Sequence, residues 1–203
     1  MISKKEKIRQ KKYQAFRSPR DVYMPIISKH LRKKFLGSVL EPCAGDGRII
    51  KDLIRLGNKN QHCIVDIRSL ERKNWRKKGL IKKLGPDYCI KDNFLELPVF
   101  KKFDAVITNP PFKEAVEITE HSLDFVNDGK SVLILQRSSW LGTQNRSKWM
   151  EKSCLNRIWV VPKRPIWEID GVKKNSSDNV EYYWYEFVKG KRSNKDPRIK
   201  WMW

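Results

Sequence analysis

Short apolar runs alternate with amphipathic segments along most of this chain. The apolar runs, rich in β-branched residues, predict buried strands at 37–40, 62–67, 87–90, 103–108 and 131–135. The segments between them predict helices, with apolar residues at helical spacing in 22–31, 49–54 and 114–126 and a basic stretch at 68–83. Strands and helices that alternate in this way favour an α/β fold with a doubly wound, mostly parallel sheet.

The last third of the chain has a different pattern. A helix is expected at about 144–153, and strands at 157–161 and 180–188 follow with no clear helix between them. These two strands are expected to form an antiparallel hairpin at one edge of the sheet. The residues between them are expected to form a polar loop, and Asp128-Gly129 is expected to form a turn.

The length of the chain suits one domain with a sizeable core, since 39% of its 203 residues are hydrophobic. We divide it into a basic amino-terminal arm (1–12), a catalytic core (13–188) and a basic, aromatic tail (189–203). The tail ends in Trp201-Met202-Trp203. These tryptophans either stack on nucleic-acid bases or pack back on the domain.

Charge is the strongest signal in the composition. Lys and Arg number 44 against 23 Asp and Glu, which gives a formal net charge of +21. Such an excess favours a polyanionic partner, and nucleic acid is the first expectation. A membrane surface is a weaker alternative because no strongly amphipathic helix stands out, and a merely soluble basic surface is the simplest one.

The four cysteines, Cys43, Cys63, Cys89 and Cys154, are far apart and include no CxxC pair. This spacing argues against a zinc site, so no metal is expected. Most of them occupy apolar, strand-like contexts, which argues against disulfides. No apolar run is long enough to span a membrane, and the amino terminus lacks a signal peptide. A reduced protein of the cytoplasm fits these features.

The most informative stretch is Asn109-Pro110-Pro111-Phe112, which follows the apolar run 103–108. Two consecutive prolines end a strand and fix a rigid turn at its carboxyl end, where ligands bind in α/β sheets. The Asn109 amide and the Pro110 carbonyl provide acceptors, and Phe112 provides an aromatic face. Such a slot suits a flat group with an amino function, such as adenine. The alternative is an ordinary turn with Phe112 in the core.

A second turn, with the sequence Glu41-Pro42-Cys43-Ala44-Gly45-Asp46-Gly47, follows the first predicted strand. Glycine allows the backbone to approach a ligand closely, and the turn matches neither GxGxxG nor a Walker phosphate loop. A nucleoside with a cationic tail suits it better than a pyrophosphate. Asp66 ends the next strand about 20 residues later, where an acidic residue commonly binds ribose hydroxyls. A helix N-cap is the alternative for Asp66.

Asp92-Asn93-Phe94 follows the strand at 87–90. Asp92 or Asn93 could hold the amino group of an adenine while Phe94 packs nearby. The alternative is a polar turn followed by a core phenylalanine.

In their order and spacing, these motifs and Phe16-Arg17-Ser18-Pro19 resemble those of class I S-adenosylmethionine-dependent methyltransferases. The chain is most similar to small N6-adenine DNA methyltransferases of the kind that bacteriophages encode. The resemblance covers about residues 13–188 and implies a Rossmann-like sheet and S-adenosyl-L-methionine as the cofactor. DNA is the implied partner, and the host cytoplasm is the location if a phage encodes the protein.

The resemblance also implies roles for single residues. Ser18 and Pro19 would lie near the methionine end of the cofactor. The cofactor turn would be formed by Glu41, Ala44, Gly45 and Gly47. Asp66 would bind the ribose and Asp92 the cofactor adenine. The family often has Asp directly before Phe, whereas Asn93 stands between them here, so Asp92 and Asn93 are competing candidates. A large target-recognition domain is also missing.

The implied reaction is methyl transfer to the exocyclic N6 amine of adenine. Asn109 and Pro110 would accept hydrogen bonds from this amine, Pro111 would keep the turn rigid, and Phe112 would stack on a flipped base. Three other functions remain open: adenine methylation in RNA, methylation of a protein glutamine amide, and nucleic-acid binding without catalysis.

Overall fold

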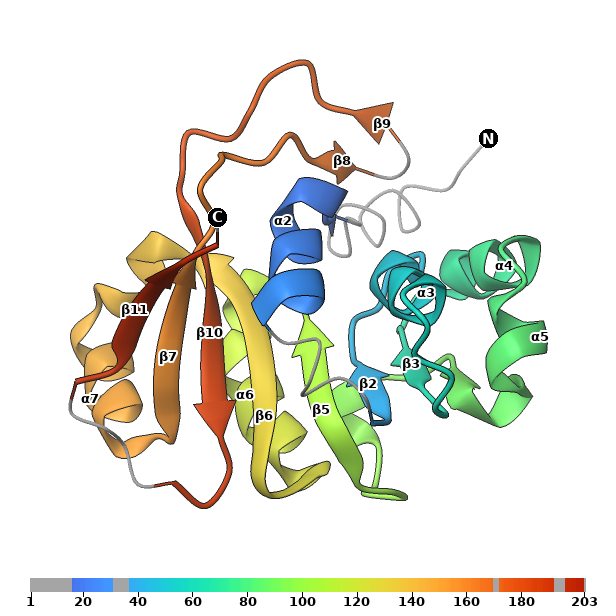
Figure 1. Cartoon of the computed structure of the whole chain (residues 1–203), viewed down its shortest axis with the longest axis horizontal. Coiled ribbons are helices and arrows are strands. Elements are labelled where there is room, and N and C mark those ends of the chain that lie inside the picture. Colours follow the sequence, from blue (N-terminus) through green and yellow to red (C-terminus); the bar gives the residue numbers. More distant parts are fainter. Residues whose placement is uncertain (1–15, 31–36, 170–171, 192–195, 203) are drawn as a thin grey trace, which may run out of the picture.

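The computed structural model of the protein describes residues 16–30, 37–169, 172–191 and 196–202. Its main sheet has eight strands in the order β11-β7-β10-β6-β5-β2-β3-β4 (Figure 1). The expected arm at 1–12 and Trp203 lie outside the described residues.

The parallel half of the sheet contains the five strands that the apolar runs predicted. They are β2 (Val39–Glu41), β3 (Cys63–Val65), β4 (Cys89–Ile90), β5 (Phe103–Thr108) and β6 (Val126–Arg137). β2 lies between β3 and β5, so the order of the strands reverses beside it. In open α/β sheets, such a switch point marks the crevice where ligands bind.

The other half of the sheet contains the antiparallel strands. β10 (Tyr182–Val188) pairs antiparallel with both β6 and β7 (Leu155–Val160), which confirms the expected antiparallel pair. This pair does not form the edge of the sheet, because β11 (Arg198–Trp201) adds a parallel strand outside β7. The apolar pattern did not predict β11, whose four residues are all exposed. Met202, directly after it, is buried, whereas Trp201 is 53% exposed, so it is Met202 and not Trp201 that packs back on the sheet.

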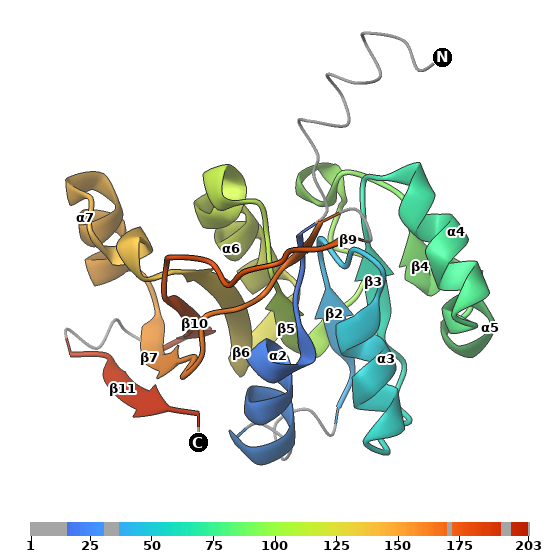
Figure 2. The ribbon, with the colours of Figure 1, turned by 90° about the horizontal axis from the view of Figure 1, so that it is seen from above.

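Helices cover both faces of the sheet (Figure 2). α2 (Arg20–Pro25), the π-helical turn Ile26–His30 and α3 (Arg48–Arg55) lie on one face, and α6 (Ala115–Asp124) and α7 (Gln144–Lys152) lie on the other. Alternate residues of the central strands serve the two cores: Ile107 packs with the α2–α3 side and Val106 with the α6–α7 side. No helix in the described ranges is long and apolar enough to cross a membrane.

The basic stretch at 68–83 forms α4 (Ser69–Lys77) and α5 (Leu80–Leu84). It is less solvated than its charges suggested, because Trp75 and Leu80 are completely buried. The described residues also contain 3-10 turns of three or four residues, at Pro86–Tyr88, Phe94–Glu96, Phe112–Glu114 and Ser138–Leu141.

Two loop predictions need correction. Asp128-Gly129 is not a turn before a strand but lies within β6, whose pairing with β5 shifts register between Phe103 and Ala105. The expected polar loop at 162–179 contains β8 (Glu168–Ile169) and β9 (Val172–Lys173). β8 pairs with β1 (Phe16–Arg17), and this small sheet crosses above the carboxyl ends of the parallel strands (Figure 1). The β1–β8 pair joins residues about 150 positions apart, so no local sequence pattern predicts it.

Candidate active site

The turn after β2 is folded tightly against the end of β3. Gly45 and Gly47 have φ angles of 55° and 71°, a left-handed conformation that favours glycine. The Ala44 N–H donates to the Val65 carbonyl at 2.8 Å. The Gly45 N–H donates to the Asp66 carboxylate at 2.8 Å. The structure therefore brings the glycine turn and Asp66 together, as their places at the two strand ends predicted.

The two glycines of this turn have different surroundings. A Cβ at Gly47 would lie 2.6 Å from Leu80 Cδ1, so this glycine allows α5 to pack against the turn. Among the described residues, a Cβ at Gly45 would have only one neighbour within 4 Å, the Arg68 Nη2 at 3.6 Å. The α-carbon of Gly45 is thus open to a ligand on this side, while its N–H is bonded to Asp66 and its carbonyl accepts from the Trp75 indole N–H.

Asp66 is buried and its carboxylate is already well bonded. One oxygen accepts from the Arg68 N–H and Nε, both at 2.9 Å, and the other from Gly45 and from the Arg68 Nη2 at 3.0 Å. The bond to the Arg68 N–H lies just before α4, whose N-cap residue is Arg68 itself, so Asp66 does not occupy the N-cap position. Binding of ribose by Asp66 remains a prediction, and it requires Arg68 to give up part of this pairing.

Glu41 ends β2 below the turn and is also buried. It accepts a hydrogen bond from the Ile50 N–H in α3 at 3.3 Å. Burial raises the pKa of Glu41 well above its ordinary value. This side chain therefore ties the strand end to α3.

Ser18 and Asn109 meet although 91 positions separate them. The Asn109 Nδ2 donates to the Ser18 hydroxyl at 3.1 Å. Among the described residues, the side-chain oxygen of Asn109 has no hydrogen-bond partner. Ser18 is buried and Pro19, half-buried, immediately precedes α2. The β5 end is joined to the glycine turn as well, because the Thr108 hydroxyl donates to the Pro42 carbonyl.

The rest of the proline turn is held from β6. The Gln136 amide donates to the Pro110 carbonyl at 3.4 Å, and a carbonyl oxygen can accept a second bond. Pro111 is exposed. Phe112 is half-buried, and the Arg137 guanidinium lies over its ring, 4.3 Å from the centroid. A base that stacks on Phe112 would use the other face or displace Arg137.

Asp92, Asn93 and Phe94, which follow β4, differ in exposure and in contacts. Asp92 is exposed. Asn93 caps the 3-10 turn that follows, since its side-chain oxygen accepts from the Leu95 N–H at 3.3 Å. Phe94 is only 4% exposed and packs on His121 and Phe125 in the core, which favours the core alternative for Phe94. Of the two candidates for an adenine contact, Asp92 is the more accessible.

A network of ion pairs, which sequence reasoning missed, joins the small sheet to the glycine turn. Glu168 of β8 accepts from Arg17 at 2.7 Å and from Arg48 at 2.9 Å. Arg48 also contacts Asp46 at 2.9 Å, and Asp46 in turn contacts Lys78 at 2.5 Å. Burial alone would raise the pKa of Asp46, but the hydrogen bonds from Arg48 and Lys78 lower it to about 2.

Comparison with known proteins addresses the fold. No protein-family model and no curated protein matches the sequence. Several solved structures do match the fold. One is a Listeria monocytogenes protein described as a class I S-adenosylmethionine-dependent methyltransferase (TM-score 0.63, 14% identity, 91% of this chain and 65% of that chain). Another is described as an RNA methyltransferase, from Pyrococcus horikoshii (0.60, 16%, 86% of each). A third is the M protein of the type I restriction enzyme EcoKI (0.63, 17%, 88% of this chain and 46% of that chain).

The chain has the class I methyltransferase fold. It spans about two thirds of the Listeria protein and about half of the EcoKI M protein. The predicted fold class is therefore confirmed, and it places the glycine turn, Asp66 and the proline turn at the carboxyl edge of a methyltransferase sheet.

Proposed function

We propose that this protein transfers a methyl group from S-adenosylmethionine to the N6 amine of adenine in DNA. The observation that carries the proposal is the side-chain oxygen of Asn109, which is unpartnered among the described residues and belongs to the same turn as the Pro110 carbonyl. Both acceptors are neutral and lie at the end of β5. They match an amine that has two N–H groups to donate.

The residues at the glycine turn fit S-adenosylmethionine. Gly45 leaves its α-carbon approachable, because among the described residues only the Arg68 guanidinium lies within 4 Å of the place of a Cβ. Asp66 offers carboxylate oxygens to ribose hydroxyls, and Asp92 offers an exposed acceptor to adenine. Bound there, the cofactor supplies a methyl group on sulfonium, which is already a good electrophile.

The protein then has to orient a poor nucleophile, since the lone pair of the adenine amine is delocalised into the ring. Hydrogen bonds to Asn109 and Pro110 favour a more tetrahedral nitrogen with an available lone pair. Positive charge develops on this nitrogen during transfer, so acceptors aimed at it stabilise the transition state more than the ground state. Ser18 and Gln136 hold the two acceptors in place.

The net charge of +21 supports a nucleic-acid substrate. The described fold matches are consistent with either polymer, since one is a restriction-enzyme M protein and another is described as an RNA methyltransferase. Adenine in RNA is therefore the second candidate, favoured by a match that covers 86% of both chains.

Transfer of labelled methyl groups tests the proposal directly. The purified protein is incubated with labelled S-adenosylmethionine and duplex DNA, single-stranded DNA, RNA or protein, and the modified nucleoside is identified by mass spectrometry. N6-methyladenine in DNA is expected. If the label is found only in RNA or only in protein, that polymer and not DNA is the substrate. If calorimetry shows cofactor binding but no methyl group is transferred to any acceptor, the protein is a binding module and the catalytic proposal is wrong.

A further inference from the structure

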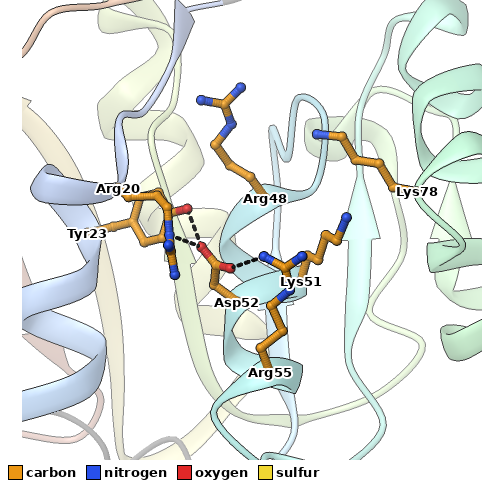
Figure 3. Close-up of a pocket in the computed structure, with 7 residues that line it drawn as sticks. All are labelled: Arg20, Tyr23, Arg48, Lys51, Asp52, Arg55 and Lys78. Atoms are coloured by element: carbon orange, nitrogen blue, oxygen red, sulfur yellow. Dashed lines mark hydrogen bonds and ion pairs between the residues drawn. The ribbon is translucent and has the colours of Figure 1, made fainter.

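A basic pocket of about 210 Å³ lies between α2 and α3 (Figure 3). Five cationic side chains line it: Arg20, Arg48, Lys51, Arg55 and Lys78. Asp52 and Tyr23 complete the lining. Among the described residues, the wall carries five formal positive charges and one negative charge. Asp46 and Glu168, outside the lining, partly offset Arg48 and Lys78, and a bound anion would relieve the repulsion that remains.

The buried Asp52 carboxylate fixes two of the arginines. It accepts from the Tyr23 hydroxyl at 2.7 Å, the Arg20 Nε at 2.9 Å and the Arg55 Nη1 at 3.2 Å. Each guanidinium has further N–H groups beyond those that bind Asp52. Arg20 and Arg55 are about 60% exposed (63% and 61%), so these groups are accessible to a ligand from solvent.

The remaining cations come from the α3 face and from the end of α4. Arg48 and Lys78 share Asp46, at 2.9 and 2.5 Å. Lys51 has no ion-pair partner within the described segments, and it projects between Arg55 and Lys78 in Figure 3. Lys51 is therefore a cation whose charge no carboxylate of the described structure offsets.

The pocket is connected to the proline turn through two residues. Arg48 lines the pocket and its Nη1 donates to the Ser18 carbonyl at 3.3 Å. The hydroxyl of Ser18 accepts from Asn109. Arg48 and Ser18 thus link the pocket to the amide that is proposed to receive the target amine.

We propose that this pocket binds a backbone phosphate of the nucleic-acid substrate. The proposal rests on the nucleic-acid substrate of the proposed function. Guanidinium forks and a lysine match phosphate oxygens, and a phosphate contact positions a strand without reading its sequence. The pocket would thus fix how the strand enters the site, at a place where no base edge needs to be recognised.

The test compares two double variants in nucleic-acid binding. Lys51→Gln with Arg55→Gln removes two pocket cations, and Lys148→Gln with Lys152→Gln removes two exposed cations of α7, on the opposite face of the sheet (Figure 2). Binding of one labelled DNA duplex is followed by fluorescence anisotropy between about 50 and 200 mM salt. The pocket variant is expected to bind about tenfold more weakly. The slope of log affinity against log salt should fall by about 0.9, as for one lost phosphate contact.

The kinetic expectation is equally specific. The KM for DNA should rise in the pocket variant, with kcat at saturating DNA and calorimetric affinity for S-adenosylmethionine unchanged. Equal affinity and slope in the two double variants would overturn the proposal, as would a parallel loss of cofactor affinity. If inorganic phosphate binds the pocket while the substitutions leave DNA binding intact, the site serves a small anion and the proposal is likewise wrong.

Two controls keep this test separate from folding and from the proposed function. Lys51→Gln alone breaks no ion pair of the described structure, so it tests the pocket if the double variant is unstable. The second control compares methylation with binding. If the wild-type protein methylates no nucleic acid but the pocket variant loses DNA binding, the catalytic proposal is refuted and the pocket proposal is supported.

Discussion

The turn after β2 and the turn after β5 lie at the same edge of the sheet but use their polar groups differently. Around the glycine turn, Asp46 and Asp66 are both buried and paired with Arg48, Lys78 and Arg68. At the proline turn, the Asn109 oxygen has no partner in the described structure and the Pro110 carbonyl has one distant donor. A buried carboxylate requires partners, because burial of an unpaired charge is costly. A neutral, half-buried amide can leave an acceptor open to a substrate.

This difference gives the two turns different sensitivities. Substitution at the proline turn should affect turnover without affecting stability, whereas substitution at the glycine turn should affect cofactor affinity, stability or both. The following predictions test that division, from the largest expected effect to the smallest.

Asn109→Ala should lower kcat by two to three orders of magnitude, or about 2.7–4 kcal/mol, the scale of a lost transition-state hydrogen bond. Cofactor affinity should change little, because the cofactor is proposed to bind at the other turn. Single-turnover methyl transfer and calorimetry measure the two quantities. Asn145→Ala, an exposed position in α7, is the matched control and should have wild-type turnover. Near-normal turnover of Asn109→Ala would show that the proposed catalytic site is wrong.

Asp66→Asn should weaken binding of S-adenosylmethionine by about ten- to a hundredfold, or about 1.5–3 kcal/mol, because a charge-assisted acceptor of the ribose hydroxyls is lost. Calorimetric titration measures this effect. Arg68→Gln tests whether Asp66 acts on the cofactor directly, since Arg68 binds both oxygens of Asp66. Its removal should leave cofactor affinity unchanged or raise it. If Arg68→Gln weakens binding as much as Asp66→Asn, the pair acts as a unit and Asp66 has a structural role rather than a direct contact with the ribose.

Much of the parallel half of the fold could be predicted from local pattern. The strand Phe103–Thr108 has the predicted bounds because its apolar run is continuous and two prolines follow. The meeting of Gly45 with Asp66 was also predictable, since parallel strands bring their carboxyl ends to one edge.

The elements that were missed depend on distant partners. Arg17 pairs with Glu168 across 151 positions, and neither residue has a local signal for strand formation. Trp75 is surrounded by the basic residues of 68–83, a composition that is typical of a solvated helix. It packs in the core cluster with Ile64 and Leu80, and its indole N–H donates to the Gly45 carbonyl at 2.7 Å, contacts that the local pattern does not encode.

Asp46 should make stability depend on acid pH. Its pKa is lowered from 3.8 to about 2 in the folded protein, so its stabilising effect is complete above pH 3.8 and is lost as the pH falls toward 2. The full effect is about 2 kcal/mol, of which about 1 kcal/mol should disappear between about pH 5 and 3. The free energies of unfolding of the wild type and Asp46→Asn, measured with urea, should therefore approach each other over this range. Asp87→Asn, at an exposed position, is the control, and its free energy of unfolding should change with pH as that of the wild type does. A constant difference between the wild type and Asp46→Asn would show that charge is not the source of the stabilisation.

The smallest effect is expected at Glu168, which holds the small sheet over the glycine turn. Its side chain is 26% exposed and paired with Arg17 and Arg48, so Glu168→Gln should cost only about 0.5–1 kcal/mol locally. Hydrogen exchange of the β1 and β8 amides should accelerate about two- to fivefold, because their opening becomes easier by this amount. Amides of β5, which β2 and β6 flank, should be unaffected. Glu181→Gln is the matched control, since Glu181 pairs with Arg164 at 2.6 Å outside the small sheet. Equal exchange in both variants would mean that backbone pairing and the packing of Trp167 on Phe16 of β1, with ring centroids 6.3 Å apart, hold the small sheet in place rather than the ion pairs.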